Sequence, residues 1–143
     1  MLPVRPDYPV AWRGRLICDV SQVPEVTAEA LEFLLCQHCN EPEIRARNLA
    51  LVEACNNAIL HADASARCFP IQVEALCRQE WIELRITDHT AGFDWPARLE
   101  LPRPDQESGR GLYLIRSVMD TVAYHRGAGE NVLVLCRSRV SLG

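Results

Sequence analysis

One helical stretch, residues 51–62, constrains the fold of this chain more than any other segment. It reads Leu-Val-Glu-Ala-Cys-Asn-Asn-Ala-Ile-Leu-His-Ala and continues a helix that we expect to begin near residues 41–42, since proline is tolerated in a first turn. At 100° per residue its apolar side chains cover most of the circumference, which is typical of a buried helix. A narrow polar line remains, formed by Glu53, Asn57 and His61 at a spacing of i, i+4, i+8.

This polar line needs partners. A buried polar group without a hydrogen bond costs roughly 2–7 kcal/mol, so Glu53 and Asn57 are expected either to be satisfied within the fold or to bind a ligand. A metal–phosphate group would be such a ligand. His61 lies two turns beyond Glu53, and we interpret it as a supporting residue or simply as the end of the helix.

Composition indicates one globular domain over residues 1–143, because 48% of the residues are hydrophobic and the chain is long enough to bury a core. The net charge of −4 argues against binding to a nucleic-acid backbone. No apolar run approaches the roughly 18 residues that span a membrane, and the first residues have no signal-peptide pattern. We therefore expect a cytoplasmic protein that binds neither nucleic acid nor membrane.

The seven cysteines are an odd number without framework spacing, and we expect reduced thiols. Cys55 and Cys77 fall on apolar faces and are predicted to pack as small hydrophobic residues. Cys36 and Cys39 are the one suggestive pair. They could be half of a zinc site, a redox motif or thiols at a helix end, and no second pair with matching spacing follows them.

The remaining pattern predicts the order β-α-α-β-β-loop-α-β-β, which is a sheet covered on one face by helices. The expected elements are an irregular arm over residues 1–14, a strand over 15–20, a helix over 24–39, alternating strands over 71–78 and 81–87, a helix over 112–121 and a hairpin of strands over 123–127 and 131–140.

Two further features carry chemistry. Continuing the alternation of strand 81–87 places Asp88 on the apolar face at the end of the strand, as a functional carboxylate or as a cap. After the loop at 89–108, which is long enough to suggest a function, Gly109 and Gly111 precede a helix. Glycines there leave backbone N–H groups open to a phosphate at the positive end of the helix, although they also serve plain turns.

Taken together, the three signals resemble the N, G1 and G2 boxes of the GHKL ATP-binding superfamily: Glu53-x-x-x-Asn57, Asp88-x-x-x-Gly92 and Gly109-x-Gly111. Residues 50–62 and 107–115 are similar to the corresponding boxes of anti-sigma-factor serine kinases, and the resemblance spans about residues 16–138. One residue departs from the pattern. The G1 box of this family usually reads Asp-x-Gly-x-Gly, and Thr90 stands in place of its first glycine.

For the nucleotide, the resemblance implies that Asp88 accepts a hydrogen bond from the exocyclic amine of adenine and that Gly92 lets the backbone approach the base. It implies that Asn57 gives its amide oxygen to Mg²⁺, a cation that takes oxygen ligands. The segment 89–108 would be the ATP lid. The phosphate ligands implied by the resemblance are Gly109, Arg110, Gly111 and Leu112.

For the reaction, the resemblance implies that Glu53 orients the acceptor hydroxyl and takes its proton. The implied fold is α+β, a two-layer α/β sandwich with a mixed, mostly antiparallel sheet. The implied function is an anti-sigma factor with protein serine kinase activity that uses ATP and Mg²⁺, phosphorylates a STAS-type anti-anti-sigma partner, regulates a sigma factor and forms a homodimer.

Two alternatives stay open at this point. A nucleotide-binding regulator could sequester a sigma factor or another protein without phosphate transfer, and it would need Asn57 and Asp88 but not Glu53 as a base. In a purely structural alternative, Glu53 and Asn57 are satisfied internally, Asp88 is a cap and the glycines form a turn.

Overall fold

The structure is a computed structural model that describes residues 10–37, 41–90 and 110–139. In these ranges it confirms the predicted order of elements. They are β1 (Val10–Leu16), α1 (Val23–Cys36), α2 (Glu41–Leu60), β2 (Ile71–Cys77), β3 (Trp81–Asp88), α3 (Arg110–Val118), β4 (Thr121–Arg126) and β5 (Asn131–Ser138), with 3-10 turns at Val20–Gln22 and Ala66–Cys68.

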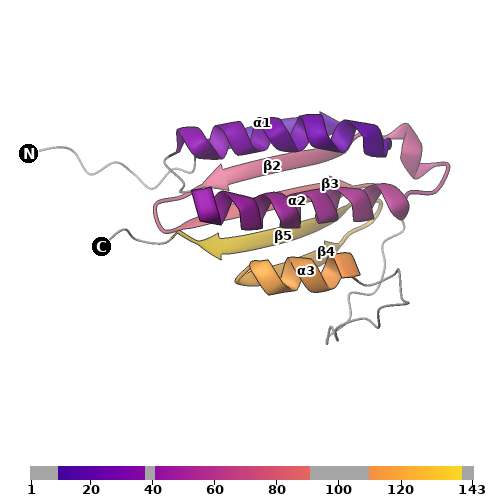
Figure 1. Ribbon diagram of the computed structural model, residues 1–143. Helices are drawn as coiled ribbons and strands as arrows, with labels where there is room; N and C mark the ends of the chain where they lie inside the picture. The colour runs from indigo at the N-terminus through magenta and orange to yellow at the C-terminus, as the bar shows by residue number, and fades with distance from the viewer. Residues whose placement is uncertain (1–9, 38–40, 91–109, 140–143) are drawn as a thin grey trace, which may run out of the picture.

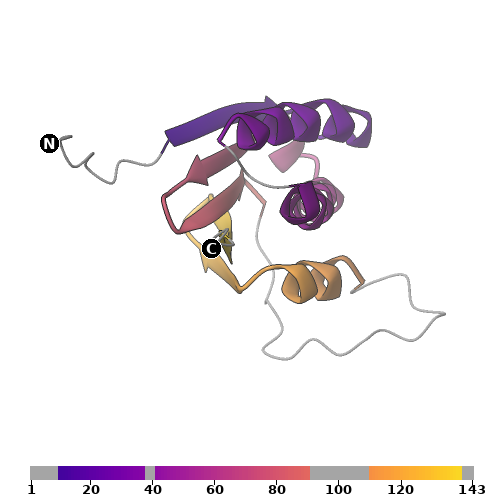
Figure 2. The ribbon, with the colours of Figure 1, turned by 60° about the vertical axis from the view of Figure 1, so that its left-hand side comes forward.

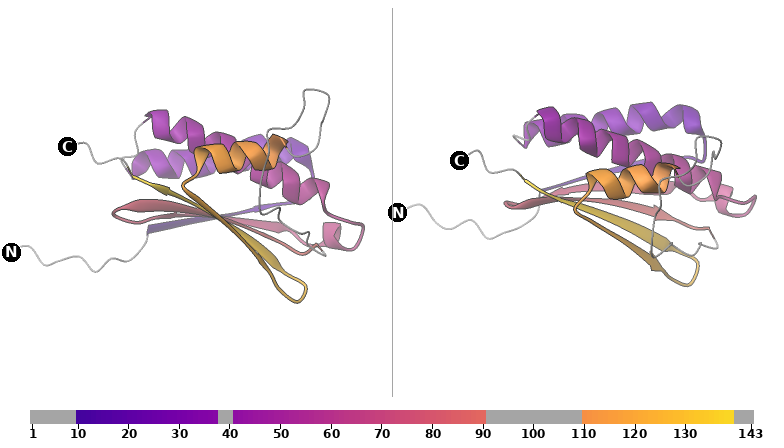
Figure 3. Two further views of the ribbon diagram at one scale, coloured as in Figure 1. Left: turned by 90° about the horizontal axis from the view of Figure 1, so that it is seen from below. Right: turned by 60° about the horizontal axis from the view of Figure 1, so that its bottom comes forward.

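The strands form one five-stranded sheet in the order β1-β2-β3-β5-β4, and all three helices lie on one face of it (Figures 1 and 3). This confirms the predicted two-layer α+β sandwich. All four pairings of neighbouring strands are antiparallel, so the described strands contain no parallel pair of the kind that a mixed sheet would require.

No helix in the described ranges combines the length and apolar character needed to cross a membrane.

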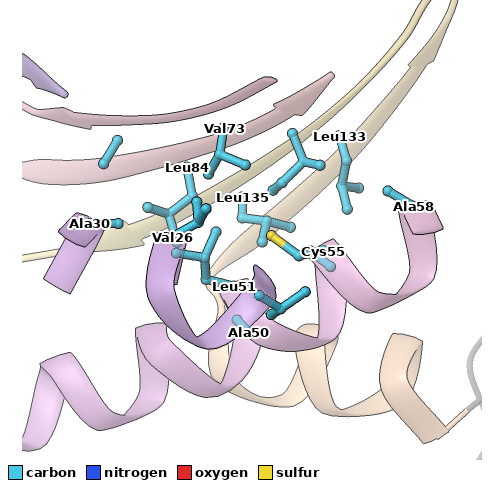
Figure 4. Close-up of a cluster of buried hydrophobic side chains, with 14 of the residues drawn as sticks. Val26, Ala30, Ala50, Leu51, Cys55, Ala58, Val73, Leu84, Leu133 and Leu135 are labelled. Carbon is cyan, nitrogen blue, oxygen red and sulfur yellow. The ribbon is translucent and has the colours of Figure 1, made fainter. Parts of the chain in front are cut away.

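The core lies between the sheet and α2, which is the middle helix of the layer (Figure 1). Figure 4 shows Leu51 and Cys55 of α2 beside Leu84 and Leu135 of the sheet, and each of these four side chains is at most 1% exposed. Burial raises the pKa of the Cys55 thiol to about 12. Cys55 therefore stays protonated and packs as a small hydrophobic residue, as the sequence predicts.

The first strand lies earlier than predicted. A strand over residues 15–20 after an irregular arm is wrong in its boundaries, because β1 already begins at Val10. The glycine at position 14 does not break the strand, since the ring of Trp12 lies over it: a Cβ on Gly14 would be 2.5 Å from Cη2 of Trp12. The aromatic ring fills the space that a missing side chain leaves on that face. Residues 1–9 of the predicted arm lie outside the described residues.

The C-terminal helix also differs from its predicted range, because α3 ends at Val118 rather than near Thr121. Asp120 causes the change of direction. Its backbone N–H donates to the carbonyl of Cys136 at 2.9 Å, and its carboxylate accepts from the N–H of Ser138 at 2.6 Å. The Ser138 hydrogen bonds, and then the charges of Arg137 and Arg47, hold the pKa of Asp120 below its usual value. Tertiary hydrogen bonds therefore end the helix where the local pattern would continue it.

We predict that truncating the centre of α2 destabilises the fold strongly. Leu51 is 1% exposed, so Leu51→Ala should lower the free energy of unfolding by about 2–5 kcal/mol through lost contacts and a residual cavity. Leu60 on the same helix is 72% exposed, and Leu60→Ala should change it by less than about 0.5 kcal/mol. Urea denaturation of both variants measures the difference, and equal losses would show that α2 is not the core helix.

Candidate functional site

The polar line of α2 lies against the first turn of α3. These two helices run side by side over the sheet in Figures 1 and 2. A Cβ built on Gly111 would be 2.8 Å from Oε2 of Glu53, 3.4 Å from Nδ2 of Asn57 and 3.6 Å from Oδ1 of Asn57. The structure therefore brings Glu53, Asn57 and Gly111 together. Two of the three predicted segments thus lie together, with the Glu53 carboxylate near the positive end of α3.

The third segment reaches the same place through a small cavity beside this contact. Its volume of about 10 Å³ is close to the space that one water needs. Side chains of α2, α3 and three strands line it: Ala54, Asn57, Ala58, His61, Ile86, Asp88, Leu112, Tyr124 and Leu133. Asn57, Asp88 and Leu112 thus meet at one cavity, as the sequence predicts, and His61 borders it as well.

Asn57 carries an unsatisfied donor. Its Nδ2 is buried and, among the residues that the structure describes, has no hydrogen-bond partner. An unsatisfied buried donor costs about 1–3 kcal/mol, so such groups are uncommon in structural positions. The purely structural alternative for Asn57, in which the fold itself satisfies the amide, is therefore not what the described residues show. An anionic oxygen in the cavity would satisfy this donor and leave Oδ1 free for a cation.

Asp88 is satisfied on one side only. Its Oδ1 accepts hydrogen bonds from the backbone N–H of Thr90 at 3.0 Å, from the Thr90 hydroxyl at 2.9 Å and from Nδ2 of Asn131 at 3.0 Å. Within the described part of the chain, Oδ2 accepts none. Oδ1 of Asp88 therefore caps the turn after β3, while Oδ2 remains an acceptor on a residue that borders the cavity, and the functional role of Asp88 stays a prediction.

Several predicted site residues cannot be placed. Gly92, Gly109 and most of the segment 89–108 lie outside the described residues. Arg110 begins α3, but its side chain also lies outside the described part of the structure. Cys36 is exposed. The hypotheses for the Cys36–Cys39 pair stay untested, because Cys39 lies outside the described residues. The roles assigned to all of these residues remain predictions.

The sequence analysis missed two residues of this site, Asn131 and Tyr124. Asn131 is 1% exposed and pairs with Asp88 across β3 and β5. It alternates with the buried Leu133 and Leu135, so the signal was a polar residue at the start of an apolar strand face. Tyr124 of β4 borders the cavity and lies opposite Leu133 in the register of β4 and β5.

A larger hollow of about 320 Å³ lies between β1 and β2, bordered by Arg13, Gly14, Arg15, Gln72, Val73 and Glu74. Arg13 pairs there with Glu74 at 3.2 Å, and the Arg13 side chain is 78% exposed. Solvated ion pairs of this kind carry little energy and no special reactivity. None of the predicted site residues borders this hollow, so its size does not make it the functional site.

Comparisons with known proteins agree with this geometry. A family model described as a histidine kinase-like ATPase domain matches residues 18–137. The serine-protein kinase RsbW of Listeria monocytogenes serovar 1/2a is 28% identical in an alignment 143 positions long, which covers 93% of this chain and 82% of that protein.

Two solved structures resemble the fold. The structure of the RsbU and RsbW domains of Rv1364c from Mycobacterium tuberculosis superposes with a TM-score of 0.67 at 18% identity, covering 91% of this chain and 32% of that chain. The SiaB–SiaC complex from Pseudomonas aeruginosa gives a TM-score of 0.56 at 12% identity, with coverage of 92% and 91%. These likenesses show the same architecture.

The unsatisfied donor predicts a gain in stability on its removal. Asn57→Leu replaces the amide with an apolar group of similar size and should raise the free energy of unfolding of the ligand-free protein by about 1 kcal/mol. Asn56 lies next to it on α2 but does not border the cavity, and Asn56→Leu serves as the control without a gain. Urea denaturation measures both. A loss of stability in Asn57→Leu would show that the amide has a partner in the protein.

Proposed function

The chain belongs to the histidine kinase-like ATPase family, and from this membership we propose that it is an anti-sigma factor that phosphorylates a serine of a STAS-type anti-anti-sigma partner with ATP. One observation carries the proposal: Glu53 and Asn57 meet the first turn of α3 at Gly111, next to the cavity that holds Asp88. The relatedness to serine-protein kinases RsbW makes this chain a serine kinase rather than a histidine kinase.

The residues present fit ATP with Mg²⁺. The unsatisfied Nδ2 of Asn57 and the N–H groups at the start of α3 offer donors to phosphate oxygens. The described residues contain no cluster of three His, Cys, Asp or Glu side chains that could hold a metal ion by themselves. Mg²⁺ does not need such a cluster, because it is usually held by one or two protein oxygens together with phosphates and waters. Oδ1 of Asn57 would be the protein ligand.

Glu53 supplies the chemistry that distinguishes a kinase from a nucleotide-binding protein. Its carboxylate lies beside the α3 N-terminus, where we expect the terminal phosphate. In the proposed reaction the serine oxygen bonds to the terminal phosphorus, the bond from that phosphorus to the bridging oxygen of ADP breaks, and the serine proton passes to Glu53. A base in this position typically accelerates such a transfer about 10²–10⁴-fold.

The proposed partners and location do not all have the same support. Binding to an anti-anti-sigma protein is supported by the relationship to RsbW. We further propose that the protein controls a sigma factor, forms a homodimer and is cytoplasmic. The alternative is a regulator that binds nucleotide and sequesters its partner without phosphate transfer. The position of Glu53 against Gly111 favours the kinase, because mere sequestration needs no carboxylate there.

The direct test is phosphate transfer. The protein is incubated with labelled ATP, Mg²⁺ and candidate STAS-domain partners encoded near it, and the partner is examined for phosphoserine. Incorporation into a serine of the partner supports the proposal. Stable binding of partner and nucleotide without any incorporation would favour the sequestering alternative.

We predict that Glu53→Gln separates binding from catalysis. The substitution keeps the size of the side chain but removes the base, so Mg-ATP affinity should change less than threefold while phosphate transfer falls by about 10²-fold or more. Glu29→Gln, an exposed substitution on α1, is the matched control and should leave both unchanged. Calorimetric ATP binding and labelled-phosphate transfer are measured together. Unchanged transfer in Glu53→Gln would refute the catalytic role.

We also predict that Asp88→Asn changes nucleotide preference. The Thr90 and Asn131 donors retain an oxygen acceptor in the variant, so its new NH₂ group takes the place of Oδ2 at the cavity. This group repels the adenine amine but matches the carbonyl of guanine. ATP affinity should fall by at least about tenfold, as loss of a hydrogen bond to a charged group implies, while GTP affinity stays or rises. Competition binding measures both, and equal weakening would show that Asp88 does not contact the base.

A further inference from the structure

We propose that Thr90 and Asn131 are positioning residues that set adenine specificity by holding the Asp88 carboxylate in one orientation. This inference rests on the proposed function, because it takes Asp88 as the contact to the adenine amine. It assigns a role to the residue that departs from the usual G1 pattern and to one that carried no motif in the sequence. Both residues act through Asp88 and are not themselves expected to touch the reacting atoms.

Asn131 is placed for this role by the sheet. It lies directly opposite Asp88 in the register of β3 and β5, and its side chain is 1% exposed. Nδ2 of Asn131 lies 3.0 Å from Oδ1 of Asp88 and 2.8 Å from the carbonyl oxygen of Thr90. The two hydrogens of one amide nitrogen thus satisfy two acceptors at once. A single side chain therefore connects the carboxylate with the backbone that follows β3.

Thr90 completes the arrangement from the other direction. A glycine in its place would supply only the backbone N–H to Asp88, whereas Thr90 also donates its hydroxyl at 2.9 Å. Thr90 is 6% exposed and Asp88 is 8% exposed, so water competes little for these bonds. The threonine thus adds a second donor from the same residue.

The combined effect is to make the two carboxylate oxygens unequal. Oδ1 accepts three hydrogen bonds, and a carboxylate oxygen has room for few more. The side chain cannot rotate about its last bond without breaking all three, so Oδ2 stays directed away from these donors. An oxygen that only accepts selects a base edge that donates. An amine such as that of adenine fits this oxygen, and a carbonyl such as that of guanine is repelled.

The experiment compares ATP with purine riboside triphosphate, which lacks the exocyclic amine and cannot make the proposed contact. Affinities of both are measured for wild type, Asn131→Leu and Thr90→Val, which are apolar substitutions of similar size. Thr87→Val is the control. Thr87 precedes Asp88 on β3 and is similarly buried at 5% exposure, but it belongs to neither the hydrogen-bond network nor the cavity. Thermal unfolding confirms that each variant is folded.

We expect wild type and Thr87→Val to prefer ATP by tenfold or more. In Asn131→Leu this preference should fall by about tenfold because ATP affinity drops while affinity for the analogue is unchanged, and in Thr90→Val by about threefold. A structural defect alone would weaken both nucleotides equally.

The possible outcomes distinguish failure of the positioning role from failure of the proposed function. Wild-type preference that persists in both variants, or equal weakening of both nucleotides, would overturn the positioning role and leave the proposed function standing. Absence of ATP binding in wild type would overturn the proposed function and this inference with it, whereas ATP binding without any preference would overturn only the contact between Asp88 and the amine, and this inference. If Asn131→Leu does not fold, Thr90→Val decides, since it retains the backbone N–H and the Asn131 amide as donors.

Discussion

The site depends on one constraint: α2 is buried on two sides and still carries a carboxylate and an amide. Its apolar residues face the sheet, and Glu53 and Asn57 lie in the contact with α3. That contact excludes water from Nδ2 of Asn57 without offering it a partner in the described residues. The helix therefore keeps an unsatisfied donor that the fold does not need, and such local violations are expected where a protein binds a ligand.

The two ends of the proposed site differ in how far the protein itself satisfies their polar groups. At the proposed base end, three donors on Oδ1 fix the Asp88 carboxylate, one from Asn131 of β5 and two from Thr90 just after β3. At the phosphate end, the Asn57 amide has an unmet donor. In the proposed site, the acceptor for the base is therefore already held in place before binding, whereas a phosphate oxygen would supply the partner that the Asn57 amide lacks. The cavity between these two ends is small, about 10 Å³, and Asn57, Asp88 and Leu112 all border it.

Much of this could be predicted from periodicity, because α2, β2 and β3 have patterns set by burial on known faces. The failures have tertiary causes. Residues 10–14 are predicted to belong to an irregular arm, whereas they belong to β1, where the Trp12 ring covers Gly14, and α3 ends early because Asp120 bonds to β5. Asn131 was missed because its meaning lies in the register of β5 against β3, which places it opposite Asp88 and which one chain segment cannot reveal.

The choice between a kinase and a sequestering protein turns on Gly111. At the second position of α3, alanine would favour the helix over glycine by about 1 kcal/mol. The glycine lacks that contribution, and a Cβ in its place would approach Oε2 of Glu53 to 2.8 Å, so an alanine here would shift the Glu53 carboxylate from its position beside the start of α3. A protein that only held nucleotide would gain nothing from this arrangement, since the backbone N–H groups serve phosphates equally well behind an alanine. The missing methyl group leaves room for the Glu53 carboxylate that we propose as the base.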